Sequence, residues 1–278
     1  MYIRLYSLVC FVCLALSTSA QTPFTLDGSW MFADVSLHVS DKSGTTTALL
    51  DTGCTACFMD STYAADHFSI VVDTLPVCGL NSDKHSVHYT YLEKVDFCGQ
   101  TFKDVYFCIT DLKKMLPNRE LRFIIGGDLL DGHAWRFDME KKLIEVCDAR
   151  KRYGSYAVKW HSYDEKNRIY QDIILDDCTV DGKKLWMVFD TGATSCTLPK
   201  GTYEGVPDTV KTLHATLTES LDTVYFVKYR DKRLSSGKWH IKSDFTVRDN
   251  DHYGLLNLSF LKGHSFVLNY RKRIIDII

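Results

Sequence analysis

The sequence lacks the features that mark nucleic acid binding proteins, membrane proteins and chains with flexible linkers. Its formal net charge of −2 gives no basic field of the kind that nucleic acid binding needs. The Lys-Arg clusters at 150–152 and 271–273 are short and are interpreted as solvated turns. Beyond residue 20 no apolar stretch approaches the length of a membrane span, and the 5 prolines mark no linker. We therefore expect a globular chain that neither binds nucleic acid nor spans a membrane.

Metal-ligand patterns are also scarce. The segment Cys54-Thr55-Ala56-Cys57 has the spacing of a redox or zinc site. No second Cys-x-x-Cys or Cys/His pair is available to complete a tetrahedral zinc site, and His85 and His88 form an isolated pair. A structural role for Cys54 and Cys57 is favoured, with redox chemistry and a metal site as the alternatives. We expect no metal and no cofactor.

The first 20 residues have the pattern of a secretory signal peptide. Arg4 gives a positive start, residues 5–16 are mostly apolar, and residues 17–20 are small. We expect cleavage near Ala20 and export, so that the mature protein, residues 21–278, is secreted or periplasmic. The cysteines that remain are even in number, which predicts disulfide bonds in an exported chain, although the sequence does not choose their pairing. They are Cys54, Cys57, Cys78, Cys98, Cys108, Cys147, Cys178 and Cys196.

What the sequence does contain is a duplicated motif. Asp-Thr-Gly occurs at 51–53 and again at 190–192, and each copy follows three apolar residues. Thr and Cys recur at the same offsets after the Asp. Gly132-His133 and Gly263-His264 follow at similar distances, with matching apolar positions beyond them. Matching surroundings over half of the chain indicate a duplicated unit.

The coarse secondary structure is almost all strand. Val35, Leu37 and Val39 alternate with polar residues, and residues 41–44 then turn the chain into a strand that ends at Asp51. Alternation of this kind is typical of a strand with one buried face, so the first copy of the motif is expected at the end of a half-buried strand.

Turn residues mark further hairpins. One is predicted at Asp181-Gly182 and another between strands at 95–97 and 105–109, joined through Gly99. Only residues 60–67 and 110–116 resemble helices, and both segments are short. The pattern predicts an all-β protein.

These motifs resemble the pepsin and retropepsin clan of aspartic peptidases, and more specifically a single-chain doublet of retropepsin-type lobes. The similarity covers most of residues 30–278 and includes the apolar-apolar-Gly segment Ile124-Ile125-Gly126. It implies an all-β, bilobal pepsin-like fold, in which two retropepsin-like β-barrel lobes are related by a pseudo-twofold axis with the active site between them. We place the lobes at residues 21–153 and 154–278. One chain should then make one complete site as a monomer.

The resemblance implies a secreted aspartic endopeptidase that hydrolyses peptide or protein substrates with a water activated between two carboxylates. Like charges that meet at such a site cannot both ionise, so the pair is expected to share one proton. The catalytic residues are expected to be Asp51 and Asp190. The active-site loops are expected to be supported by Thr52, Gly53, Thr191 and Gly192.

Three positions depart from the family pattern. Asn257 stands where the second copy should carry the Gly of its apolar-apolar-Gly segment, and Asn is the next most tolerant residue for unusual backbone angles. Cys54 and Ala193 follow the two motifs at a position where Ala, Ser or Thr is usual, so neither place carries a hydroxyl group. We therefore expect the carboxylates to lack an outer hydrogen bond and the pH optimum to be less acidic than that of pepsin.

A flap over the cleft is expected at 85–95, with Tyr89 or Tyr91 as the aromatic residue that reaches the substrate, and a counterpart is expected at 216–227. Two alternative functions are kept. The chain could be a catalytically silent peptide-binding module with the pepsin fold, or a thiol-disulfide protein that acts through Cys54 and Cys57. The first alternative predicts binding of a statine-type inhibitor without cleavage.

Overall fold

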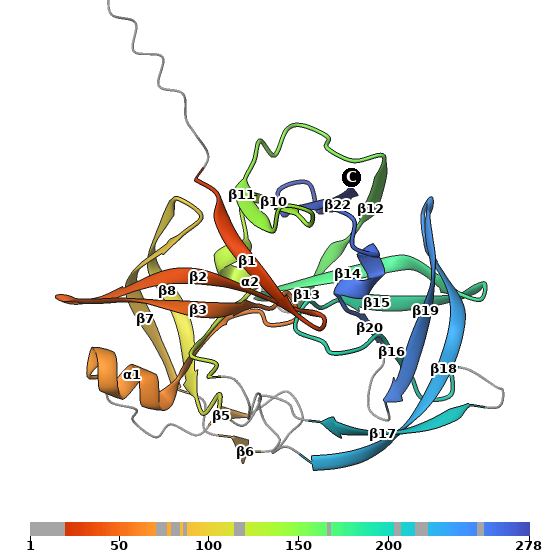
Figure 1. Ribbon diagram of the computed structural model, residues 1–278, viewed down its shortest axis with the longest axis horizontal. Helices are drawn as coiled ribbons and strands as arrows, with labels where there is room; N and C mark the ends of the chain where they lie inside the picture. Colours follow the sequence, from red (N-terminus) through yellow and green to blue (C-terminus); the bar gives the residue numbers. More distant parts are fainter. Residues whose placement is uncertain are drawn as a thin grey trace, which may run out of the picture.

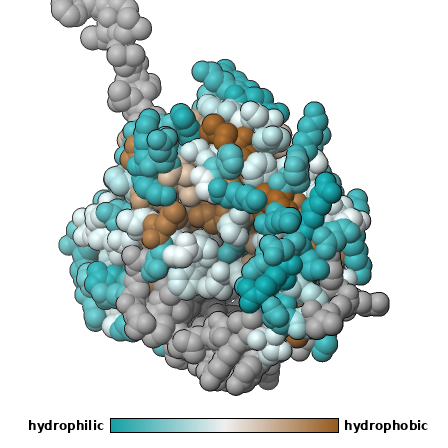
Figure 2. Space-filling model, turned by 45° about the vertical axis from the view of Figure 1, so that its right-hand side comes forward, coloured by the Kyte–Doolittle hydropathy of each residue, from teal (hydrophilic) through white to brown (hydrophobic). Residues whose placement is uncertain are grey.

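The computed structural model describes residues 20–70, 77–78, 84–85, 88–113, 120–165, 168–202, 207–214, 222–248 and 253–278. Strands account for 59% of the structure and helices for 8%, which confirms the all-β class (Figure 1). The strands form closed six-stranded barrels. Figure 2 shows hydrophilic residues over much of one face, with small apolar patches between them. This agrees with apolar side chains that are mainly buried inside the barrels.

The first barrel is a closed ring in which each strand pairs with the next and the last pairs with the first. In ring order its strands are β2 (Trp30–Val39), β3 (Lys42–Leu50), β9 (Phe123–Ile125), β4 (Cys57–Asp60), β8 (Gln100–Thr110) and β7 (His88–Phe97). Val35 and Leu37 point into its core, as their alternation predicted, because successive side chains of a strand face opposite sides.

The second barrel repeats this order. Its strands are β14 (Arg168–Val180), β15 (Lys183–Phe189), β20 (Gly254–Leu256), β16 (Thr197–Pro199), β19 (Trp239–Arg248) and β18 (Asp222–Ser236). Between β20 and β16 the ring closes through a hydrogen bond of 3.0 Å from Leu255 N–H to Thr197 Oγ1. The repeated order agrees with the duplicated unit that the sequence indicated.

A third group of strands joins the two halves of the chain. Its order is β1 (Thr22–Asp27), β11 (Leu143–Val146), β10 (Ala134–Asp138), β21 (Phe266–Asn269), β22 (Ile274–Ile277) and β12 (Tyr156–Lys159). The halves meet where β10 pairs with β21, and there the rings of Phe137 and Phe266 stack at 4.5 Å. The predicted lobe boundary at residues 153–154 falls in the connection between β11 and β12 and stays a prediction.

The hairpins that the sequence predicted are confirmed. Asp181 and Gly182 join β14 to β15, and Cys98 and Gly99 join β7 to β8, in both cases with positive φ at the two residues. Two-residue turns of this kind match the right-handed twist of the strands. The turn from β2 to β3 is also confirmed, although it is made by residues 40–41, ahead of the predicted 41–44.

Other elements are short. They are α1 (Ser61–Phe68), α2 (Gly127–Leu130), the 3₁₀ helix η1 (Leu258–Leu261), the hairpin of β5 (Val77–Cys78) and β6 (Lys84–His85), and the strands β13 (His161–Glu165) and β17 (Asp208–His214), which pair with β14 and β18. The first predicted helix is confirmed as α1, which begins where the Asp60 side chain accepts the Tyr63 N–H at 3.0 Å.

The second predicted helix, at 110–116, is wrong where the structure describes it. Thr110 is the last residue of β8, and the Asp111 side chain then accepts the Lys113 N–H at 3.1 Å, which makes a turn. Residues 114–116 lie outside the described residues.

The prediction of disulfide bonds is wrong for the seven cysteines whose side chains the structure describes, since all seven are free thiols. Most of them are buried, and a buried free cysteine acts as a small apolar residue. Burial raises the pKa of the thiols of Cys57, Cys98, Cys108 and Cys178 to about 12. The side chain of Cys78 lies outside the described residues.

The predicted signal peptide, residues 1–20, lies outside the described residues except for Ala20. In the part of the chain that is described, no helix has the length and apolar character needed to cross a membrane.

Candidate active site

The two Asp-Thr-Gly motifs occupy equivalent places in the two barrels. Asp51 directly follows β3, and its N–H donates to the Ile125 carbonyl of the parallel neighbour β9 at 3.0 Å. Asp190 directly follows β15, and its N–H donates to the Leu256 carbonyl of the parallel neighbour β20 at 2.9 Å. Each carboxylate is therefore held at the carboxyl end of a pair of parallel strands.

The structure brings the two loops into direct contact. A Cβ atom added to Gly53 would lie 2.4 Å from Cγ of Asp190, and one added to Gly192 would lie 2.3 Å from Cγ of Asp51. Distances this short leave no room for a side chain at either position. Glycine is required there because the carboxylate of the opposite loop lies against its Cα. The carboxylate of each loop therefore packs on the glycine of the other.

The two threonines lock the loops together by four reciprocal hydrogen bonds. Thr52 Oγ1 donates to the Phe189 carbonyl at 2.7 Å and accepts the Thr191 N–H at 3.1 Å. Thr191 Oγ1 donates to the Leu50 carbonyl at 2.7 Å and accepts the Thr52 N–H at 3.1 Å. Both threonines are buried, so these bonds form away from water and fix the two halves of the site relative to each other.

The carboxylates interact strongly. Asp51 is only 6% exposed, and the Asp190 carboxyl faces it. Burial raises the pKa of Asp190 well above its usual value, and the charge and hydrogen bond of Asp51 raise it further. The N–H groups of Gly192 and Ala193 act in the opposite direction. Asp190 therefore keeps its proton at a pH where an isolated carboxyl group has lost it.

The position after the first motif corrects one expectation. The Cys54 thiol donates to Asp51 Oδ2, with 3.1 Å between sulfur and oxygen, so the first carboxylate does have an outer hydrogen bond. Burial, followed by the charge of Asp51, raises the pKa of this thiol well above its usual value and keeps it protonated. In the second loop Ala193 has no side-chain donor, and its backbone N–H acts on Asp190. The expectation was wrong for Asp51 because it considered hydroxyl donors alone, whereas the thiol of Cys54 is also a donor.

Two further residues of the first half donate hydrogen bonds to the second loop, and they were not predicted from the sequence. Trp30 Nε1–H donates to the Gly192 carbonyl at 2.7 Å, and Ser29 Oγ donates to the Ala193 carbonyl at 2.9 Å. Both lie at the turn from β1 to β2. No local pattern marks them, because their partners are more than 160 residues away in the sequence.

An apolar cluster lies beside Asp51, separate from the main core. Cys54, Trp30 and Phe58 are partly buried and pack against its fully buried members. These members are Phe32, Leu49, Leu112, Leu121 and Ile124. Cys54, whose thiol donates to Asp51, therefore connects the first carboxylate to this apolar cluster.

Asn257 occupies the place of Gly126 for a reason other than backbone tolerance. Its φ of −81° is open to any residue, and its side chain accepts hydrogen bonds from Ser259 Oγ at 2.6 Å and from the Cys196 thiol at 3.3 Å. In the first half, a Cβ atom on Gly126 would lie 2.2 Å from the Ala56 carbonyl oxygen. The second half therefore has room for a side chain where the first does not.

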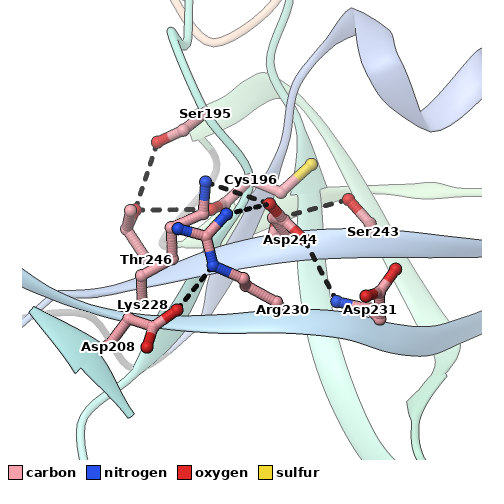
Figure 3. A network of polar contacts seen from close by, with 9 residues as sticks. All are labelled: Ser195, Cys196, Asp208, Lys228, Arg230, Asp231, Ser243, Asp244 and Thr246. Carbon is pink, nitrogen blue, oxygen red and sulfur yellow. Dashed lines mark hydrogen bonds and ion pairs between the residues drawn. The ribbon is translucent and has the colours of Figure 1, made fainter. Parts of the chain in front are cut away.

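Beyond the second loop, polar contacts connect the barrel strands (Figure 3). Ser195 Oγ lies 3.1 Å from Thr246 Oγ1 of β19. Asp244 of the same strand pairs with Lys228 Nζ at 3.0 Å and accepts the Asp231 N–H at 3.0 Å, both from β18. The hydrogen bond from Lys228 contributes most to lowering the pKa of Asp244. These contacts connect β18 to β19, and β19 pairs with β16, the strand that follows the second loop.

The predicted flap tyrosines are not brought to the carboxylates by any contact within the described residues. Tyr89 and Tyr91 lie on β7, are 45% and 61% exposed, and contact the ring of Tyr106 at 5.1 Å and 5.7 Å. Strand β7 is part of the barrel wall, whereas β5 and β6 form a separate hairpin before it. Contact of these tyrosines with substrate stays a prediction.

The predicted counterpart flap, 216–227, falls on the hairpin of β17 and β18. Residues 216–221 lie outside the described residues, and residues 222–227 begin β18, which pairs with β17. Both this hairpin and that of β5 and β6 lie along the lower edge of the view in Figure 1.

Two other features of the described residues bear on ligand binding. In the described ranges, no group of three His, Cys, Asp or Glu side chains could hold a metal ion. An open cavity of about 410 Å³ on the first barrel contains no residue of either Asp-Thr-Gly loop. Its lining residues are Asp34, Thr45, Thr46, Thr47, Glu120 and Arg122.

Comparison of the chain with protein-family models and with curated protein sequences gave no match.

Proposed function

We propose that this protein is an aspartic endopeptidase of the pepsin and retropepsin type. The observation that carries the proposal is the mutual packing of the two Asp-Thr-Gly loops, in which each carboxylate lies against the glycine of the other loop. The four threonine hydrogen bonds add rigidity to this arrangement. A pair of buried carboxylates with one shared proton can act as acid and base in the same step.

In the proposed reaction a water molecule held between Asp51 and Asp190 attacks the carbonyl carbon of a peptide bond. One carboxylate takes a proton from the water, and the protonated partner donates its proton to the carbonyl oxygen. The threonine and glycine contacts hold both groups in place, so that little reorganisation is needed during the reaction.

The fold supports the same proposal. Two barrels with the same strand order, each ending a central strand at an Asp-Thr-Gly loop, are what a bilobal pepsin-like chain requires. Because both carboxylates come from one chain, a monomer would suffice for activity. The signal pattern at residues 1–20 makes a secreted or periplasmic peptidase the proposed setting.

The apolar cluster beside Asp51 bears on the substrate class. Trp30, Cys54 and Phe58 are the members with some exposure. A peptide side chain next to the cleaved bond would meet this apolar cluster, and burying it there would favour binding. The proposed substrates are therefore peptides or proteins with an apolar residue next to the cleaved bond.

The test is cleavage of a mixed peptide library by the mature protein, residues 21–278, from about pH 3 to about pH 7, followed by mass spectrometry of the products. The control is the double variant Asp51→Asn, Asp190→Asn, which keeps the shape of both side chains. Cleavage by the native protein alone supports the proposal. Binding of a statine-type inhibitor without cleavage at any pH would instead favour a peptide-binding module.

The thiol-disulfide alternative makes the opposite prediction for two single variants. If Cys54 carried the chemistry, Asp190→Asn would keep activity and Cys54→Ser would lose it. The proposed peptidase requires that Asp190→Asn abolish cleavage and that Cys54→Ser retain it.

A further inference from the structure

The two carboxylates differ in their hydrogen-bond partners, although their loops are otherwise matched. Each accepts the N–H of the glycine in its own loop, at 2.9 Å for Asp51 Oδ1 and 2.8 Å for Asp190 Oδ1. Asp51 also accepts the Cys54 thiol on its other oxygen, Oδ2, at 3.1 Å. The matching residue of the second loop is Ala193, whose methyl group donates nothing, so that this residue acts on Asp190 only through its backbone N–H. A side-chain donor is therefore present on one carboxylate and absent from the other.

The direction of this hydrogen bond follows from the surroundings of the thiol. Cys54 is partly buried and packs against the apolar cluster, so its charged thiolate form is disfavoured. The titratable groups that act on it are Asp51, Asp190 and Cys57, and Cys57 in turn faces Asp128. All of these disfavour a negative charge on the sulfur. The thiol therefore keeps its proton and serves as the donor.

A donor stabilises the carboxylate form of its acceptor, because a hydrogen bond to a charged oxygen is stronger than one to a neutral carboxyl. In a pair that shares one proton, the carboxyl with the extra donor holds the negative charge and its partner holds the proton. The side-chain donor on Asp51 thus breaks the symmetry that the glycine and threonine contacts would otherwise give.

We propose that Cys54 is a positioning residue that holds Asp51 as the carboxylate, so that the shared proton lies on Asp190. This inference rests on the proposed peptidase function. In the first step the water oxygen bonds to the peptide carbonyl carbon, Asp51 takes one proton from that water, and the proton on Asp190 moves to the carbonyl oxygen. Asp51 is then the general base and Asp190 the general acid of this step.

The test compares the pH dependence of kcat/KM for the native protein, Cys54→Ala and Cys54→Ser. Cys54→Ala removes the donor, so the acidic limb of the profile should move to higher pH by about half to one unit. Cys54→Ser supplies a stronger hydroxyl donor, so the limb should move to lower pH. Cys147→Ala, which removes a partly buried free thiol outside the loops, should leave the limb in place. Coincident profiles for all four proteins would overturn the inference.

A second measurement does not depend on cleavage. With ¹³C-labelled aspartate carboxyls, assigned by Asp51→Asn and Asp190→Asn, NMR titration should show the Asp51 signal changing at lower pH than the Asp190 signal. Cys54→Ala should bring the two titrations closer together. An ordered titration without peptide cleavage would refute the peptidase while supporting the proton placement. Cleavage with a titration that Cys54→Ala and Cys54→Ser both leave unchanged would refute the placement alone.

Discussion

Removal of one hydroxyl from the threonine contact between the loops should destabilise the whole protein. The perturbation is Thr52→Val, which keeps the shape of the side chain and deletes Oγ1. Two groups then lose their partner, the Phe189 carbonyl at 2.7 Å and the Thr191 N–H at 3.1 Å. Thr52 is only 3% exposed, so water does not readily replace the lost bonds.

The magnitude follows from these two groups. A buried donor or acceptor without a partner costs about 1 to 3 kcal/mol, so the two groups together should lower the free energy of unfolding of Thr52→Val by about 2 to 6 kcal/mol. Thr191→Val should have a similar effect through the Leu50 carbonyl and the Thr52 N–H. Because the four bonds belong to one network, the double variant should lose less than the sum of the single losses.

The assay is equilibrium unfolding in urea at a fixed pH, with peptide cleavage measured in parallel. Thr52→Ser keeps the hydroxyl and should lose about 1 kcal/mol for its missing methyl group. Thr47→Val, on strand β3 that leads into the loop, is the matched control, since Thr47 is exposed and its hydrogen bond to Asp34 contributes little. A Thr52→Val loss no larger than that of Thr47→Val would show that the loop contact does not hold the halves together.

Other predictions concern single contacts of the same site. Gly53→Ala should abolish activity and lower stability, because its Cβ would lie 2.4 Å from Cγ of Asp190; normal unfolding and cleavage would contradict the packing. Trp30→Phe removes the 2.7 Å bond to the Gly192 carbonyl and should lower kcat by about tenfold with a smaller change in KM, and an unchanged kcat would exclude a positioning role. Burial and Asp51 raise the pKa of Asp190, so the native protein keeps a proton on this carboxyl that the unfolded chain releases above about pH 4. The stability of the native protein should therefore fall as the pH rises from about 4 through the native pKa of Asp190. Asp190→Asn should therefore be inactive, yet more stable than the native protein in urea unfolding at neutral pH. The difference in stability should disappear at acidic pH. Equal stability of the two proteins at neutral and at acidic pH would contradict the burial of the Asp190 carboxyl.

The parts of the fold that the sequence predicted depend on local chemistry. The turns at Asp181-Gly182 and at Gly99 need positive φ, and the residue types there supply it. The end of β3 directly before Asp51 follows from the apolar residues before it and the tight turn at Gly53. Helix α1 begins at an Asp that caps it. Each of these features is determined within a few residues of its position.

What the sequence did not predict depends on contacts between distant residues. The pairing of β10 with β21 joins segments from the two halves, and neither strand shows locally which partner it takes. The cysteines follow the even-number rule for exported proteins, yet the seven described thiols are free, because pairing depends on where the strands place them. The donation from Trp30 to Gly192 is of the same kind.

The two Asp-Thr-Gly loops differ only at particular positions. The contacts between the two loops are the same in both copies of the motif. Gly53 and Gly192 each pack against the carboxylate of the opposite loop, and the threonines form equivalent hydrogen bonds. The loops differ at the residue directly after the motif, which is Cys54 in the first loop and Ala193 in the second. A symmetric pair of carboxylates would leave the proton equally on either side, whereas hydrolysis needs one base and one acid in each step. In the proposed mechanism the Cys54 thiol, as the single side-chain donor, makes Asp51 the base and Asp190 the acid without changing the contacts that hold the two loops together.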